Sequence, residues 1–401
     1  MSVIAFKLKV SFKEFCDFSG YKTMANQFDV IILGMGVMGS ATAYHLASTG
    51  KRILALEQFN LDHQLGSSHG ESRIIRYAYE NPIYVEMVKH AFPMWRDLEK
   101  VSGRDLMFTT GGFDFGAIDA PTLMKTYQSL TAAGIAFEWL DTAEANKRFP
   151  QFRVAPNERA IYQPDAGYLM ASRCVLTQIE VARSRGAVVR TETSVTRIEV
   201  SADRVTVQTE SEKYEAGSLV ITAGPWAPRV LGWLGLDMPL QPTRESYVFF
   251  MPEKPELFTP ERCPVFIYHD TPWYYGLPSV GGTGLKVGQH PRNEPVDPDT
   301  CKRTPDEDYI QQVSGWLQQH MPGAAGPVSD ARICLYTMTP DEDFIIDRHP
   351  EYPNVVFGTG FSGHGFKFGI LIGRILADLA TTGSTPFDLK LFSIRRFLPT
   401  V

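Results

Sequence analysis

The chain has 401 residues, of which 44% are hydrophobic and 21% are charged, and its formal net charge at pH 7 is −6. A chain of this length and composition is globular and long enough to form two domains. The acidic balance argues against a nucleic-acid partner. Since the sequence contains no run of about 18 uncharged apolar residues, we expect no membrane partner. Residues 1–24 lack the apolar core of a signal peptide, and we treat them as an N-terminal extension.

The first informative segment is residues 28–57, which reads as strand, glycine turn, helix and strand. Gly34, Gly36 and Gly39 form the pattern G-x-G-x-x-G directly after the first apolar run. In such a turn the first glycine permits the sharp bend, the second lets a pyrophosphate approach the backbone, and the third lets helix and strand pack closely. Gly50 is placed to end the helix.

The second strand of this unit ends at an acidic residue. Glu57 follows the apolar run 52–56 and lies roughly 20 residues beyond the glycines, where a carboxylate can bond a ribose hydroxyl. Together with the turn, this spacing predicts a dinucleotide-binding unit and makes a purely structural glycine turn the weaker interpretation. The fingerprint alone does not separate NAD from FAD.

Further apolar strands are expected at 218–222 and 354–357, and a helix at 366–380. Shorter, partly aromatic strands are expected at 247–251, 273–277, 285–288 and 332–337. We therefore predict an α/β fold in which a dinucleotide-binding domain (25–107, 168–237 and 340–397) is interrupted by a mainly antiparallel β substrate domain (108–167 and 238–339). Pro93 falls within the helical run 82–100 and predicts a kink or break there.

The five cysteines are scattered and include no C-x-x-C pair. This pattern indicates neither a metal site nor a disulfide framework, and it favours a reducing, cytoplasmic location. A lone cysteine in an apolar strand, such as Cys334, is most often an inert core residue.

Residues 66–76, GSSHGESRIIR, are too polar for a packed core unless their charges are paired, and the simple interpretation is an exposed loop. At this segment the chain resembles the family of monomeric sarcosine oxidase and N-methyltryptophan oxidase, and the resemblance extends from about residue 28 to residue 397. It includes three later segments in the same order: CLYT at 334–337, PDEDFIID at 340–347 and GFSGHGFK at 360–367. The resemblance implies a Rossmann-type FAD-binding domain, a small-molecule amine substrate and a chain that acts as a monomer.

That family holds FAD covalently through a cysteine sulfur, and the matching residue is Cys334. Arg76 and Lys367 match its carboxylate-binding pair. Tyr275 and His290 match residues that line its substrate pocket, and Arg73, Lys286 and His69 match residues near its flavin ring. The full set implied to bind the cofactor is Gly34, Gly36, Val37, Met38, Gly39, Glu57, Ser67, Ser68, Gly224, Cys334, Tyr336, Gly363, Gly365 and Lys367.

The reaction implied is oxidation of an N-methyl amino acid to an imine. Hydrolysis of the imine releases formaldehyde and the primary amino acid, while O2 is reduced to hydrogen peroxide. Lys286 stands in an otherwise apolar strand, a poor place for a charge without a task, and it is expected to favour the reaction with O2.

Two departures from the family keep the substrate open: Tyr77 stands where bacterial members have histidine, and the loop 266–273 is shorter and more aromatic. Sarcosine, a larger N-methyl amino acid and a cyclic imino acid such as pipecolate all remain candidates. The alternatives for the protein are a flavin dehydrogenase that uses another acceptor and, less favoured, a flavin-binding protein without catalysis or an NAD-dependent dehydrogenase.

Overall fold

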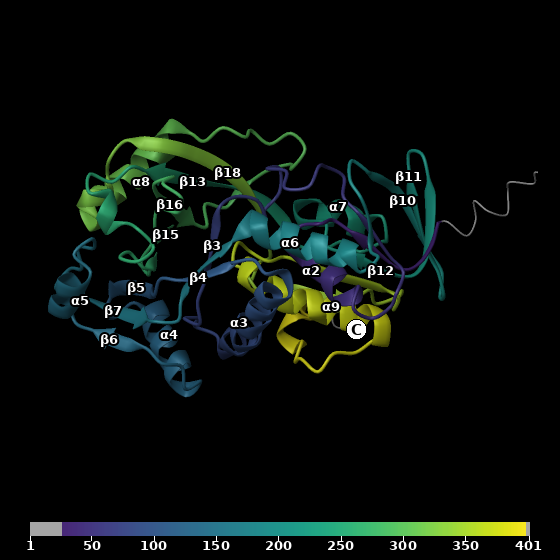
Figure 1. Cartoon of the computed structure of the whole chain (residues 1–401), viewed down its shortest axis with the longest axis horizontal. Helices are drawn as coiled ribbons and strands as arrows, with labels where there is room; N and C mark the ends of the chain where they lie inside the picture. Colours follow the sequence, from purple (N-terminus) through teal and green to yellow (C-terminus); the bar gives the residue numbers. More distant parts are fainter. Residues whose placement is uncertain (1–25, 398–401) are drawn as a thin grey trace, which may run out of the picture.

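The computed structural model describes residues 26–397, which form two large sheets side by side with helices packed on them (Figure 1). The first sheet has eight strands, and its centre is parallel: β1 (Gln27–Leu33) lies between β2 (Ile53–Leu56) and β12 (Lys213–Ile221), and β12 also pairs with β20 (Val355–Thr359). The remaining strands are β9 (Val188–Arg190), β10 (Val195–Val200), β11 (Val205–Thr209) and β19 (Ile345–Arg348). The central strands are buried on both faces, which explains their unbroken apolar runs.

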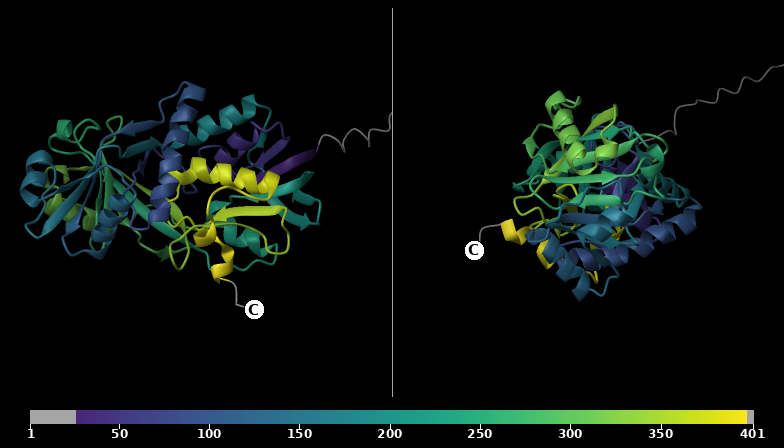
Figure 2. Two further views of the ribbon diagram at one scale, coloured as in Figure 1. Left: turned by 90° about the horizontal axis from the view of Figure 1, so that it is seen from below. Right: turned by 90° about the vertical axis from the view of Figure 1, so that its left-hand side faces the viewer.

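Helix α2 (Val37–Leu46) packs against both α6 (Ala171–Ser184) and α9 (Gly369–Thr382), and α3 (Pro82–Ser102) lies against α9 (Figure 2). The approach of α2 and α9 is close, because a Cβ on Gly373 would lie 2.3 Å from the Cβ of Ala41. Helix α2 ends at Leu46 rather than at Gly50, so that prediction is wrong; Gly50 instead closes the following turn in the left-handed region. Helix α3 continues through Pro93, so the break that was one of the two outcomes expected there does not occur.

The second large sheet has nine strands and is antiparallel except where β5 runs parallel to β14. Its members are β5 (Gly112–Ala117), β6 (Glu138–Leu140), β7 (Glu158–Gln163), β13 (Gln241–Phe250), β14 (Val265–Tyr268), β15 (Trp273–Leu277), β16 (Leu285–His290), β17 (Glu294–Pro295) and β18 (Val328–Met338). An aromatic core that includes Phe113, Phe115 and Phe266 packs beneath α8 (Glu307–His320). The predicted α/β class, with a parallel sheet and a mainly antiparallel one, is confirmed.

A third, small sheet has three strands and carries part of the predicted site. It consists of β3 (Ser72–Ile75), β8 (Gly167–Met170) and β4 (Met107–Thr109). The other helices are α4 (Pro121–Ala132), α5 (Thr142–Arg148) and α7 (Ala227–Gly232). Within residues 26–397, none of the helices is long and apolar enough to cross a membrane.

Candidate active site

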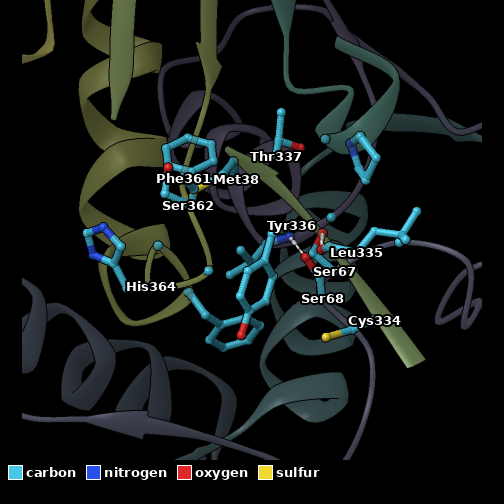
Figure 3. Close-up of a pocket in the computed structure, with 18 of the residues that line it drawn as sticks. Met38, Ser67, Ser68, Cys334, Leu335, Tyr336, Thr337, Phe361, Ser362 and His364 are labelled. Atoms are coloured by element: carbon cyan, nitrogen blue, oxygen red, sulfur yellow. Dashed lines mark hydrogen bonds between the residues drawn. The ribbon is translucent and has the colours of Figure 1, made fainter. Parts of the chain in front are cut away.

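A cavity of about 690 Å³ runs from the glycine turn after β1 to the edge of the second large sheet. This volume falls within the range of roughly 300–1,000 Å³ that is usual for small-molecule sites. All residues of the predicted catalytic, carboxylate-binding and cofactor-binding sets line the cavity except Gly39. Figure 3 shows the part of its wall where β18 meets the residues after β20.

The glycine turn brings backbone N–H groups to one end of the cavity. Gly34 has φ +88°, and a Cβ on Gly39 would lie 1.9 Å from the Gly34 carbonyl oxygen, so the third glycine serves the packing of α2 on β1 and does not line the cavity. The Val37 N–H, the first of α2, donates to Ser68 Oγ at 3.0 Å. The first turn of α2 has no acidic side chain, which suits the binding of an anion at this helix end.

Glu57 closes the same end of the cavity. One carboxylate oxygen accepts from the Met35 N–H at 2.8 Å, and the other accepts from the Phe59 N–H at 3.1 Å. The side chain is therefore held in one orientation at the carboxyl end of β2, where it lines the cavity.

Strand β18 crosses the cavity and places Cys334 and Tyr336 on the same face, two residues apart (Figure 3). The Ser67 hydroxyl donates to the Leu335 carbonyl between them. Cys334 is buried among Tyr247, Phe249 and Tyr336, and burial raises the pKa of its thiol to about 11, while the charges of Arg73 and Lys286 act in the opposite direction. Arg332, two residues before Cys334 on the same strand, is not the cation beside the thiol, because it pairs with Glu71 and Asp330.

The cations near Cys334 are instead two residues from other elements. Lys286 of β16 is 2% exposed, donates to the Ser72 carbonyl at 3.1 Å, and lies 4.2 Å from the centre of the Tyr247 ring. Arg73 of β3 donates to the carbonyls of Ser67 and His69 at 3.0 and 2.7 Å. Burial, together with the charge of Arg73, lowers the pKa of Lys286 well below its ordinary value.

Arg76 and Lys367 approach each other across a third residue, Tyr79, which the sequence reasoning did not identify. The Tyr79 ring lies 4.8 Å from the Arg76 guanidinium carbon and 5.2 Å from Lys367 Nζ, and Lys367 donates to the Tyr79 hydroxyl at 2.7 Å. Both cations are nearly buried. Burial, then the charges of Lys367 and Arg76, lowers the pKa of the nearby His290 to about 4, so this imidazole is neutral at pH 7.

Asp114 of β5 lies behind Arg76 and was also missed. Its Oδ1 atom is 3.2 Å from Arg76 Nη1 and 2.9 Å from Nε2 of His269, and both Asp114 and His269 are buried. The sequence did contain a signal for this residue, because Asp114 interrupts the apolar run GGFDFGA much as Lys286 interrupts its own apolar strand.

The two departures from the family have different outcomes. The segment 266–273, which runs from β14 to the start of β15, does form cavity wall, through Ile267, His269 and Trp273. Tyr77, in contrast, stacks on Phe92 at 4.5 Å between ring centres and is not among the lining residues that the structure describes. Both departures were expected to lie on the substrate side, and for Tyr77 that expectation is wrong: Arg76, directly before it, is the residue that lines the cavity.

The residues present fit a flavin dinucleotide. The glycine turn leads to the start of α2, whose first turn carries no acidic side chain, and to Glu57, and these are the groups that a dinucleotide needs. Farther along the cavity wall, His69 is 3% exposed, and neither its ring nitrogens nor the Tyr247 hydroxyl has a hydrogen-bond partner within residues 26–397. Buried polar atoms are rarely left unpaired, so the His69 ring and the Tyr247 hydroxyl are suited to bind a polar ring system such as that of a flavin.

A parallel sheet with this glycine turn, joined to an antiparallel sheet over one cavity, defines a dinucleotide-dependent oxidoreductase. The model of the family "FAD dependent oxidoreductase" matches residues 29–379. The chain belongs to this family.

Curated relatives match over nearly the whole chain. Monomeric sarcosine oxidase of Bacillus sp. (strain B-0618) is 38% identical over 93% of this chain and 97% of the relative. Human peroxisomal sarcosine oxidase is 37% identical over 92% and 96%, and N-methyl-L-tryptophan oxidase of Yersinia pestis is 32% identical over 92% and 99%.

Solved structures agree in fold. The open form of NikD, an unusual amino acid oxidase essential for nikkomycin biosynthesis, superposes with a TM-score of 0.82 at 26% identity and covers 92% of this chain and 97% of its own. L-proline dehydrogenase from P. horikoshii has the same TM-score of 0.82 at 21% identity, covering 93% and 98%, and shows the fold alone.

Proposed function

We propose that this protein is a flavoprotein oxidase of N-methyl amino acids, which oxidises the amine to an imine and reduces O2 to hydrogen peroxide. The observation that carries the proposal is the pair of nearly buried cations, Arg76 and Lys367, in the same cavity as the glycine turn and Cys334. Relatives named sarcosine oxidase and N-methyl-L-tryptophan oxidase support the same substrate class.

The carboxylate of the substrate would bind between Arg76 and Lys367. Arginine can hold a carboxylate with two parallel hydrogen bonds, and lysine adds a point charge. Among residues 26–397, the Lys367 Nζ atom donates to Tyr79 and to the His364 carbonyl, so the ammonium form keeps a third donor for a substrate oxygen. Because His290 is neutral, it adds no further charge beside the amine.

FAD, when bound, supplies the two-electron chemistry that joins oxidation of the amine to reduction of O2. The protein orients the substrate and excludes water around it. Burial raises the pKa values of the Tyr275 and Tyr336 phenols well above the ordinary value, so both line the cavity as neutral hydrogen-bonding groups. Lys286 would place a positive charge where O2 gains negative charge.

We further propose that the cofactor is linked through Cys334 Sγ. The cysteine lines the cavity beside Lys286 and Arg73, whose charges favour the thiolate that such a linkage requires.

The substrate is tested by measuring peroxide and formaldehyde from the purified holoenzyme with N-methylated, cyclic and primary amino acids. An N-methyl amino acid should yield peroxide and formaldehyde in equal amounts, because oxidation of the methyl group releases that carbon. Peroxide without formaldehyde from pipecolate or proline would assign a cyclic imino acid instead. Reduction of a dye by substrate without any peroxide would replace the oxidase with a dehydrogenase.

Removal of either carboxylate-binding cation should weaken substrate binding. A charge-assisted hydrogen bond contributes about 1.5–3 kcal/mol, or about tenfold to a hundredfold in affinity, so Arg76→Ala and Lys367→Met should raise KM by such a factor. Steady-state kinetics measure it, and amines without a carboxylate provide the comparison, since they should be poor substrates whose KM barely changes. Unaltered KM in both variants would contradict the assignment.

A further inference from the structure

A single buried carboxylate lies behind two residues of the cavity wall. Asp114 is 1% exposed and does not line the cavity, whereas its two neighbours, Arg76 and His269, both do. The three residues come from separate parts of the chain: Asp114 lies in β5, Arg76 directly follows β3, and His269 directly follows β14.

The Asp114 carboxylate is an anion, and both of its neighbours contact the same oxygen atom. Oδ1 accepts from His269 Nε2 at 2.9 Å and lies 3.2 Å from Arg76 Nη1. Burial alone raises the pKa of the Asp114 carboxyl, but the charge of Arg76 and the hydrogen bond from His269 outweigh it and hold that pKa below the ordinary value. The carboxylate is therefore charged at neutral pH.

The orientation of Arg76 depends on this anion. The guanidinium is held from one side by the Asp114 charge and from another by the face of Tyr79 at 4.8 Å, and Arg76 Nη1 has no hydrogen bond of good geometry within the described residues. A guanidinium so placed keeps donor capacity for a ligand in the cavity while its position is fixed. Asp114 also fixes His269, because a nitrogen that faces a carboxylate carries the proton.

We propose that Asp114 is a positioning residue, which holds Arg76 in the orientation that binds the substrate carboxylate and anchors His269 in the adjoining wall. This inference rests on the proposed carboxylate role of Arg76. It extends substrate recognition to a residue of the second sheet that touches neither substrate nor cofactor.

The test measures the Kd of an unreactive carboxylate, acetate, from the change in flavin absorbance of the holoenzyme, in a double-mutant cycle. Asp114→Asn keeps the shape and an acceptor for His269 but removes the charge, and it should raise Kd by about tenfold. In the Arg76→Ala background, where no guanidinium remains to be oriented, Asp114→Asn should change Kd by less than about twofold. Asp119→Asn is the matched control, since it removes an exposed charge just beyond the same strand and should leave Kd unaltered.

Asp114→Glu is a second variant, for use if Asp114→Asn does not fold. It keeps the charge and moves the carboxylate by one methylene group. A positioning role predicts weaker acetate binding by Asp114→Glu than by the parent, measured at a temperature where both holoenzymes are folded. Equal effects of Asp114→Asn with and without Arg76, or wild-type Kd in both Asp114 variants, would overturn the inference while leaving the proposed function intact. If Arg76→Ala itself leaves Kd unchanged, the carboxylate role of Arg76 fails, and the positioning role of Asp114 fails with it.

Discussion

Buried charge is concentrated around the cavity, and each buried cation there has a different set of neighbours. Arg76 has a full counter-charge in Asp114, whereas Lys286 and Lys367 are held by carbonyl and hydroxyl oxygens and by aromatic faces. Burial lowers the pKa of both lysines well below the ordinary value, so neither contributes a strongly favoured charge to folding. Residues of this kind are retained for function more often than for stability.

Lys286 should affect the reaction with O2 more than the reaction with substrate. Lys286→Met keeps the side-chain length and removes the charge that would stabilise negative charge developing on oxygen in a site that excludes water. Stopped-flow absorbance of the holoenzyme should therefore show a large loss of rate with O2 and a smaller change in anaerobic reduction by substrate. Lys254→Met, an exposed lysine of the same sheet region, serves as control. The reverse pattern of rates would make Lys286 a substrate or structural residue.

Covalent attachment at Cys334 should become faster as pH rises. Burial raises the pKa of the thiol to about 11, so at neutral pH only a small fraction is the reactive thiolate, and that fraction grows as pH approaches the pKa. Apoprotein mixed with FAD and sampled by acid precipitation should therefore retain flavin sooner at about pH 9 than at about pH 7.

Two cysteine variants complete that measurement. Cys334→Ala should bind flavin that acid releases at every pH, and Cys301→Ala, a half-buried cysteine outside the cavity, should attach flavin like the parent. Flavin retained by precipitated Cys334→Ala would show that the link is elsewhere.

At the scale of elements, the cofactor end of the cavity depends on how closely α2 packs. Gly39 brings α2 against the glycine turn, and Gly373 brings α9 against α2, where an added Cβ would lie 2.3 Å from that of Ala41. The helix end that is proposed to face the pyrophosphate is thus set by contacts on the other side of the helix.

Gly373→Ala should destabilise the protein, because overpacking a tight core contact costs about 1–3 kcal/mol. Gly315→Ala is the matched change in α8, where an added Cβ meets nothing within 4 Å, and it should stabilise by about 0.4–1 kcal/mol. Denaturant unfolding of both holoenzymes measures the two free energies. A Gly373→Ala variant as stable as Gly315→Ala would mean that α2 and α9 separate without cost.

At the scale of the molecule, the segment 294–306 ties the second sheet to the cavity wall of the first. Arg244 of β13 is 2% exposed and holds this segment through Glu294 and Asp306 at 2.9 and 2.7 Å. From the same segment, Asp299 accepts from the indole N–H of Trp226 at 2.6 Å, and Trp226 lines the cavity.

Arg244→Met should loosen this tie. Loss of hydrogen bonds from a buried guanidinium should lower the free energy of unfolding by about 2 kcal/mol or more. Limited proteolysis should then cut within 294–306 sooner than in the parent. Arg197→Met removes an exposed ion pair with Glu199 and should have an effect near zero. Equal sensitivity of the two variants would contradict the role given to the segment.

Local pattern determined much of this protein. The apolar runs beside Gly34 and Gly36, and the acid at Glu57, are read within one strand–helix–strand unit, so the sequence alone indicated the parallel sheet and the dinucleotide. Lys286 was also identified from local pattern, because a lysine is unusual in an apolar strand. Both sheets were expected to draw strands from separated segments of the chain, as they do. The domain limits and the roles of individual residues remain proposals.

Other features were decided only by tertiary packing. Arg76, Tyr79 and Lys367 meet because the residues after β3 lie against those before α9, and Asp114 reaches Arg76 from another sheet. Local sequence also misjudged Tyr77, which packs against Phe92, the end of α2, and the break expected at Pro93, where the helix continues. Spacing along the chain reports which face a residue shares with its near neighbours, whereas the partner across a cavity is fixed by contacts between distant segments.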